Sequence, residues 1–190
     1  ISQIDGFYKL NGATNTDNGT SGGVIAWSRW VNGGVTDLGQ LPSTTLGAGG
    51  LAQVWGTPAT NVPTSGKVDY ALVGSTRPAT PSAVVGTLDS AKLSVDFTAA
   101  KVGFEAALTI SGSPVTMTTS GGAANPSLSL RPSGTTFAAG TGQMTLSGAS
   151  SASVEGFLAG NGATHAGVGY FLGTTTGNVT GAIAFGPKAP

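Results

Sequence analysis

The stretch that decides the fold of this chain is Gly86-Thr-Leu-Asp-Ser-Ala-Lys-Leu-Ser-Val-Asp-Phe-Thr-Ala-Ala-Lys-Val-Gly-Phe-Glu-Ala-Ala-Leu-Thr-Ile110. Apolar residues take every second position in both halves, namely Leu93, Val95, Phe97, Val102, Phe104, Ala106, Leu108 and Ile110. Because successive side chains of a strand point to opposite faces, this alternation predicts two strands, each buried on one face. The link Thr98–Lys101 joins them as an antiparallel hairpin, with Lys92, Asp96 and Glu105 on its solvated face.

The composition of the whole chain agrees with a β-rich domain of low charge. The length of 190 residues suits one domain, and 39% hydrophobic residues are enough for a sizeable core. Charged residues make up 8% of the chain, against roughly 25% in typical soluble domains. The eight basic and eight acidic residues are spread singly. Since no basic patch exists, we expect no nucleic-acid partner.

Cysteine is absent, which excludes disulfides and thiolate metal sites. We expect no metal and no cofactor. The chain has no apolar run long enough for a transmembrane helix. A membrane β-barrel remains an alternative, although 7% aromatic residues are few for its aromatic girdles. The chain begins Ile1-Ser2-Gln3 without Met, so we expect a signal peptide or another region upstream of it.

Short alternating segments separated by turn residues recur along the chain, and helical periodicity is nearly absent. We expect strands at Ile4–Leu10, Gly23–Val31, Leu51–Gly56, Lys67–Gly74, Val85–Phe97, Lys101–Ile110, Pro114–Thr118, Gln143–Ser147, Ser153–Ala159, Ala166–Leu172 and Val179–Phe185. Glycines fall inside these strands at Gly103, Gly156, Gly167, Gly169 and Gly181. A small, strongly coiled barrel needs such glycines as corners more than a sandwich does.

The predicted fold is therefore all-β, an antiparallel up-and-down β-barrel of about eight strands with extra N-terminal strands. We expect a single domain over residues 1–190. Strands within 1–60 would pack on or complete a main barrel formed by 66–186, and the terminal strand would pair with the first to close it. The segments rich in Gly, Pro and Asn are predicted to be loops, at Asn11–Gly22, Gly33–Gly50, Asn61–Ser65, Ser75–Ala83 and Ser120–Pro126.

Three segments carry a resemblance to a known family. They are Ile25-Ala-Trp-Ser-Arg-Trp30, then Pro63–Gly74 with Thr76-Arg-Pro78, and finally Glu155-Gly-Phe-Leu-Ala-Gly-Asn-Gly-Ala-Thr-His-Ala-Gly-Val-Gly-Tyr-Phe171 with Val179–Phe185. Together, from about Trp27 to Phe185, they resemble transferrin-binding protein B-like β-barrel domains, as in exported FecR-domain-associated proteins of alphaproteobacteria. The resemblance implies an eight-stranded barrel in an exported lipoprotein that faces the surface or the periplasm. It also implies a family linked to binding of iron-carrying proteins or haem.

Four residues are candidates for ligand binding. Trp27 and Arg29 share one face of their strand, where they are suited to an anionic or aromatic ligand, and Trp30 lies on the other face. The structural alternative is that a tryptophan plugs a barrel end and Arg29 caps it. His165 is the only histidine, on a predicted turn where it is either a reachable haem or metal ligand or simply solvated.

Nothing in the sequence favours catalysis. No predicted strand-turn-helix is available to hold a nucleophilic serine in a Gly-x-Ser-x-Gly elbow. Glu105 and Glu155 are the only glutamates, and Glu105 lies opposite an apolar row, so we expect solvated carboxylates rather than the paired acids of a glycosidase. We predict no catalytic residue and no enzyme, with polysaccharide hydrolysis as a minor alternative.

The predicted function is a non-enzymatic, extracytoplasmic binding or surface-presentation module. A rigid barrel would hold recognition loops at Asn11–Gly22, Gly33–Gly50 and Ser120–Pro132 for a protein or small-molecule partner. The alternative is a structural subunit of a self-assembling surface filament or layer, because zero net charge favours self-association and Ile4–Leu10 is placed to extend a neighbour's sheet. A lipocalin-like carrier of a small ligand is a third possibility.

Overall fold

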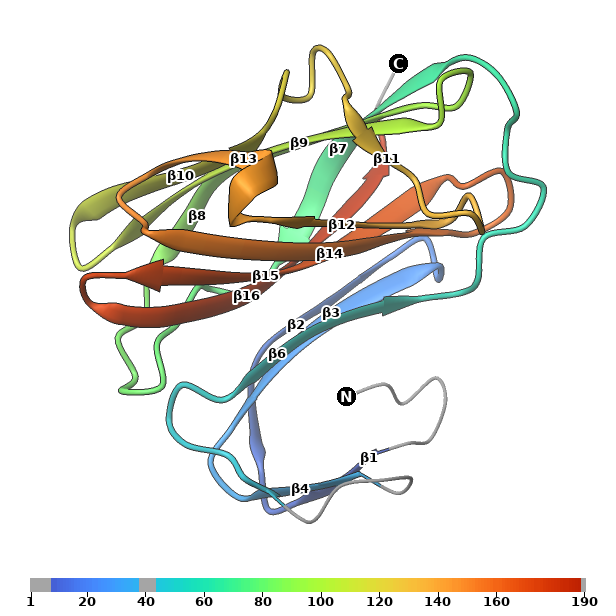
Figure 1. The fold of residues 1–190 in the computed structure, drawn as a ribbon. Helices are drawn as coiled ribbons and strands as arrows, with labels where there is room; N and C mark the ends of the chain where they lie inside the picture. The colour runs from blue at the N-terminus through green and yellow to red at the C-terminus, as the bar shows by residue number, and fades with distance from the viewer. Residues whose placement is uncertain (1–7, 38–43, 189–190) are drawn as a thin grey trace.

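The computed structural model describes residues 8–37 and 44–188. Its largest part is a ten-stranded antiparallel sheet that curls into a nearly closed barrel (Figure 1). The strands of this sheet are β7 (Lys67–Ser75), β8 (Thr87–Asp96), β9 (Lys101–Ile110), β10 (Ser113–Thr119), β11 (Leu128–Ser129), β12 (Thr136–Gly140), β13 (Met144–Ser147), β14 (Ser151–Ala159), β15 (His165–Thr174) and β16 (Gly177–Pro187). The prediction of an all-β antiparallel barrel is confirmed.

The last strand joins the two halves of the barrel sheet. β16 pairs with β7, so the predicted closing strand meets the first strand of the barrel. The neighbouring strands run in the order β12-β14-β15-β16-β7-β8-β9-β10-β13. The two edge strands of this sheet are β12 and β13, which do not pair with each other among the described residues. They follow one another in the chain through the 3₁₀ turn η1 (Thr141–Gln143), so the open seam of the barrel lies between them.

The β8–β9 hairpin forms part of the barrel wall as its alternation predicts. Val95 lies opposite Val102 and Leu93 opposite Phe104, and every member of the two apolar rows is at most 7% exposed. Phe104 meets Phe185 of β16 edge to face at a centroid distance of 6.4 Å. Because apolar side chains of facing strands fill the interior, the structure disfavours the lipocalin-like carrier.

The N-terminal part of the chain forms two smaller sheets (Figure 1). β2 (Thr14–Ser21), β3 (Ile25–Val31) and β6 (Leu51–Gly56) make the docked sheet, which lies against the outer wall of the barrel. Ile25 and Trp27 pack there on Ala184 of β16. The other sheet joins β1 (Tyr8–Asn11), β4 (Gly34–Asp37) and β5 (Thr44–Thr45).

Some sequence predictions about loops are wrong. The predicted loop Asn11–Gly22 contains strand β2, whose residues Thr-Asn-Thr-Asp-Asn-Gly-Thr-Ser suit turns by local preference. Pairing with β3 overrides that preference. The predicted loop Gly33–Gly50 likewise contains β4 and β5, and the short strands β11 and β12 were not expected. Of the predicted strand Ile4–Leu10, the described residues 8–10 belong to β1 and the rest lies outside the described residues.

Four of the five strand glycines, all except Gly169, are sites of close approach rather than corners. A Cβ at Gly156 would collide with the Phe137 ring, and one at Gly181 would collide with Tyr170. At Gly103 the obstacle is the carbonyl oxygen of Gly122. Register shifts occur instead at other positions, for example between Leu88 and Ser90. The glycines therefore make room for aromatic rings and for a turn.

Among the described residues, no helix has the length and apolar character needed to cross a membrane.

Candidate functional site

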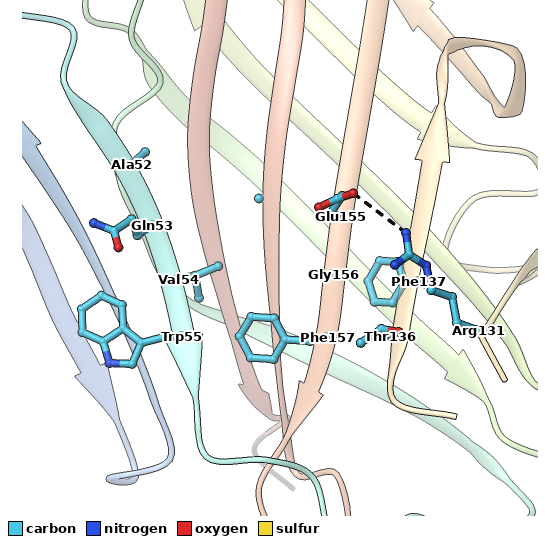
Figure 2. Close-up of a pocket in the computed structure, with 11 residues that line it drawn as sticks. Ala52, Gln53, Val54, Trp55, Arg131, Thr136, Phe137, Glu155, Gly156 and Phe157 are labelled. Carbon is cyan, nitrogen blue, oxygen red and sulfur yellow. Dashed lines mark ion pairs between the residues drawn. The ribbon is translucent and has the colours of Figure 1, made fainter. Parts of the chain in front are cut away.

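A groove runs between strand β6 and the outer face of the barrel (Figure 2). We call it the β6 groove, and its volume is about 430 Å³. Its lining comprises 52–55 of β6, 155–157 of β14, Gly169 of β15, 136–137 of β12 and Arg131. The groove exists because the docked sheet contacts β7, β15 and β16 but ends at β6, which leaves part of the β14 and β12 wall uncovered.

Apolar side chains form the inner end of the β6 groove. Val54 and Phe157 point toward one another across it (Figure 2) and belong to one hydrophobic cluster. The Phe157 ring rests on Gly167, where a Cβ would lie 2.5 Å from the ring. Two residues further along β15, a Cβ at Gly169 would meet nothing closer than the Glu155 carbonyl oxygen at 4.0 Å. Gly169 therefore leaves an open place on the barrel wall.

The edge of β6 that borders the groove has free backbone groups. Thr57 donates its N–H to the Val24 carbonyl at 2.9 Å, and Trp55 lies opposite Ala26. Because hydrogen-bonded pairs alternate along an antiparallel ladder, Leu51, Gln53 and Trp55 bond to β3. The N–H and C=O groups of Ala52 and Val54 then point away from β3, and no strand of the described part of the chain pairs with them.

Charge at the groove is limited to its outer rim. Arg131 Nη2 lies 3.9 Å from Glu155 Oε1, and both side chains are more than half exposed (Figure 2). An exposed pair of this kind contributes little to stability, so both groups are free to meet a partner. Gln53 and Trp55 point to the other side of β6 (Figure 2).

Arg29, a predicted ligand-binding residue, is buried between the docked sheet and the barrel at 2% exposure. Its Nε donates to Asp17 Oδ2 at 3.1 Å and its Nη1 to the Gly49 carbonyl at 2.6 Å. A bulge in β2 brings Asp17 opposite Arg29, and Asp17 also accepts from the backbone N–H and the Nε of Arg77. Burial lowers the pKa of Arg29, and Asp17 opposes that shift. The cluster ties the docked sheet to Arg77, two residues after the end of β7.

The other predicted site residues lie at different places around the docked sheet. Trp27 faces the barrel, with its ring against Gly19 and Gly74, whereas Trp30 lies on the opposite face. His165 is the first residue of β15 and is 5% exposed, so the expectation of a solvated turn histidine is wrong. Its Nε2 lies 3.4 Å from Ser21 Oγ and its Nδ1 3.1 Å from Thr164 Oγ1, and burial lowers its pKa. The structure does not bring the four residues together, and their role in ligand binding stays a prediction.

Comparison with known proteins gives a likeness of fold. No family profile matches the sequence, and no curated protein sequence matches it either. Among solved structures, a double mutant of transferrin-binding protein B from Haemophilus parasuis Hp5 aligns with 94% of this chain at a TM-score of 0.53 and 15% identity. The fold is similar to that of transferrin-binding protein B. Two further structures support this likeness.

A mutant of transferrin-binding protein B from Actinobacillus pleuropneumoniae H49 also gives a TM-score of 0.53, at 13% identity over 94% of this chain. A protein described as a surface lipoprotein gives 0.53 at 12% identity, again over 94%. This chain spans 38% of the Haemophilus parasuis protein and about four-fifths of the other two, 82% and 81%. The expected likeness to transferrin-binding protein B is thus found at the level of fold, and the FecR association stays a prediction.

Within this transferrin-binding protein B-like fold, the β6 groove is the part that the sequence did not reveal. Leu51–Gly56 was predicted as a strand, but its free edge depends on where the docked sheet ends. The two glutamates line different hollows. Glu155 of β14 lines the β6 groove, and Glu105 of β9 lines another hollow together with Lys92 of β8, so the glutamates do not form a pair of acids in one cleft. Within residues 8–37 and 44–188, no three His, Asp or Glu residues gather as a metal site would require.

Proposed function

We propose that this chain is a non-enzymatic binding module that works outside the cytoplasm and binds an extended segment of a partner protein as an added strand along β6. The observation that carries this proposal is the edge of β6, which no strand within residues 8–37 and 44–188 covers, above an open groove. Natural proteins usually protect such edges with charged residues or proline. The β6 sequence Leu-Ala-Gln-Val-Trp-Gly contains neither.

The dimensions of the groove suit an added strand. Such a strand would lie about 4.8 Å from β6 and bond to the free backbone groups of Ala52 and Val54. It would extend the docked sheet over the uncovered wall of β14 and β12. Side chains on its inner face would enter the space over Gly169, where the wall carries no side chain. Backbone bonds would supply affinity, and these inward side chains would supply specificity.

The compartment and the kind of partner are supported by the similar structures. Two of them are transferrin-binding proteins and one is a surface lipoprotein, so their names give protein binding and a place at the cell surface. The absence of cysteine and the low charge of this chain are compatible with export. Whether this chain's partner carries iron is a separate question, because the likeness is one of fold.

Selection from a random library of linear peptides displayed on phage tests strand addition. Selected peptides should bind the intact protein, and the amide protons of Ala52 and Val54 should shift downfield on binding. Ala52→Pro removes one N–H from the free edge, and edge positions tolerate proline. We expect this change to lower peptide affinity by about tenfold or more. Gly169→Leu, which fills the groove, should do the same.

The matched control is Ala52→Val, which keeps the N–H and should retain most of the binding. Circular dichroism of each variant would show that the fold is intact. If no peptide binds, or if selected peptides bind Ala52→Pro as well as the unchanged protein, strand addition at β6 is wrong.

Self-assembly into a surface filament or layer uses the same edge and remains the second candidate. The partner segment would then come from another copy of this chain. Concentration-dependent sedimentation that disappears in Ala52→Pro would favour self-assembly, whereas a monomer that binds peptide favours the binding module.

A further inference from the structure

The face of the docked sheet that turns away from the barrel holds a second hollow. Its volume is about 270 Å³. It is lined by Asn15, Asn18 and Thr20 from β2, Ser28 and Trp30 from β3, and Trp55 from β6, and we call it the tryptophan hollow. It shares Trp55 with the β6 groove. The docked sheet that carries it curves toward β1 and β4 (Figure 1).

The two tryptophans stand at opposite ends of one row of side chains. Trp55 of β6 lies opposite Ala26 of β3. Since Ala26 is four residues before Trp30 on β3, Trp55 and Trp30 are separated by roughly 13 Å along the strands. Trp30 donates its indole N–H to Ser28 Oγ at 2.9 Å, and this bond fixes the plane of its ring. Both rings are half-buried, so each keeps part of its apolar surface open.

The aromatic surface of the hollow comes from Trp30 and Trp55. Trp27 is also among the lining residues, but its indole lies on the opposite face of β3, against Gly19 and Gly74. The hollow therefore has one indole toward each end, with amide and hydroxyl groups between them.

The polar groups of the hollow are amides and hydroxyls. Asn18 Nδ2 donates to Asn15 Oδ1 at 3.0 Å, which orients both side chains. The side-chain oxygen Oδ1 of Asn18 and the side-chain nitrogen Nδ2 of Asn15 then have no side-chain partner among the described residues. No charged residue is among those described as lining the hollow.

We propose that the tryptophan hollow binds a neutral saccharide. A pyranose ring has an apolar C–H face that packs on an indole and hydroxyls around its edge that both donate and accept. The hollow offers the matching groups, aromatic faces with amides and hydroxyls between them. An anionic or cationic ligand would be desolvated there without an opposite charge, which disfavours it. The site is independent of strand addition at β6.

Titration with a panel of neutral sugars tests this site. The panel contains glucose, galactose, mannose, N-acetylglucosamine and the β1,4-linked dimers of glucose and N-acetylglucosamine. Because the indoles of Trp30 and Trp55 lie at the hollow, binding should change the tryptophan fluorescence with saturation. We expect a dissociation constant of about 1 mM for the best sugar, as suits one ring in an open hollow.

Substitutions of residues that line the hollow test whether the sugar binds there. Trp55→Ala and Asn18→Ala should each weaken binding by about tenfold or more. Trp55 borders both hollows, but Asn18 lines only the tryptophan hollow, so Asn18→Ala separates the two. The matched controls are Phe171→Ala and Asn178→Ala, exposed residues on the barrel, and both should bind unchanged. Ala52→Pro should also leave sugar binding unchanged.

The saccharide proposal is overturned if no sugar of the panel binds the folded protein at about 50 mM, well above the expected dissociation constant. It is also overturned if the sugar binds Asn18→Ala and Trp55→Ala as well as the unchanged protein. Binding of choline without binding of any sugar would identify the hollow as an aromatic site for cations instead.

Discussion

Arg29 and Asp17 form a buried ion pair within the docked sheet, and Asp17 also binds Arg77, two residues after β7. Arg29 is 2% exposed and its Nη2 has no partner among the described residues, so Asp17 is its main compensation. Asp17→Asn leaves the buried charge of Arg29 without a counter-charge, whereas Arg29→Met removes that charge and leaves Asp17 paired with Arg77. We expect Asp17→Asn to lower the free energy of unfolding by about 3 kcal/mol and Arg29→Met by about 1 kcal/mol or less. Urea unfolding at pH 7 measures both, and equal losses would contradict this account.

His165 gives the fold a dependence on pH. Its ring lies between the hydroxyls of Ser21 and Thr164 and close to Gly22 and Gly186, and burial lowers its pKa. The folded state thus favours the neutral ring, whereas the unfolded chain takes up a proton below about pH 6.5. The contribution of His165 to stability is therefore present above about pH 6.5 and is lost as the pH falls from there toward the lowered pKa of the folded state. Urea unfolding between pH 7.5 and 5 should show this loss, and His165→Gln should have a flatter profile. The same slope in both proteins would exclude His165 as the cause.

At the scale of elements, two glycines of β15 differ in what lies over them. A Cβ at Gly167 would lie 2.5 Å from the Phe157 ring and 2.9 Å from Val54, whereas Gly169 is open to 4.0 Å. We expect Gly167→Ala to destabilise the protein by about 2 kcal/mol, because the docked sheet must shift to admit the methyl group. Gly169→Ala is the matched control on the same face and should stay within about 0.5 kcal/mol. Thermal unfolding compares the two, and an equal fall in Tm would mean that strand glycines matter only for backbone conformation.

The elements also show what the sequence could and could not predict. The β8–β9 hairpin was predictable because one buried face forces strict alternation, as in Leu93, Val95 and Val102. β2 was not, because its Asn, Asp and Gly residues favour turns and only pairing with β3 makes a strand of them. The β6 groove could not be predicted for a related reason. Its free edge depends on which strands pair and on where the docked sheet ends, and the local sequence pattern of Leu51–Gly56 indicates neither.

At the scale of the whole molecule, the docked sheet and the barrel should unfold as one unit. Trp27 fits between Gly19 of the docked sheet and Gly74 of the barrel, and Asp17 joins Arg29 to Arg77. A sheet of three strands is at the lower limit for independent stability, so this packing should contribute much of the stability of the docked sheet. All three tryptophans lie in the docked sheet. Their fluorescence therefore reports on its unfolding, while far-ultraviolet circular dichroism reports mainly on the larger barrel sheet. We expect the two urea transitions to coincide in the unchanged protein. Loss of fluorescence at a lower urea concentration would show that the docked sheet is a separate unit, and then the β6 groove would open before the barrel unfolds.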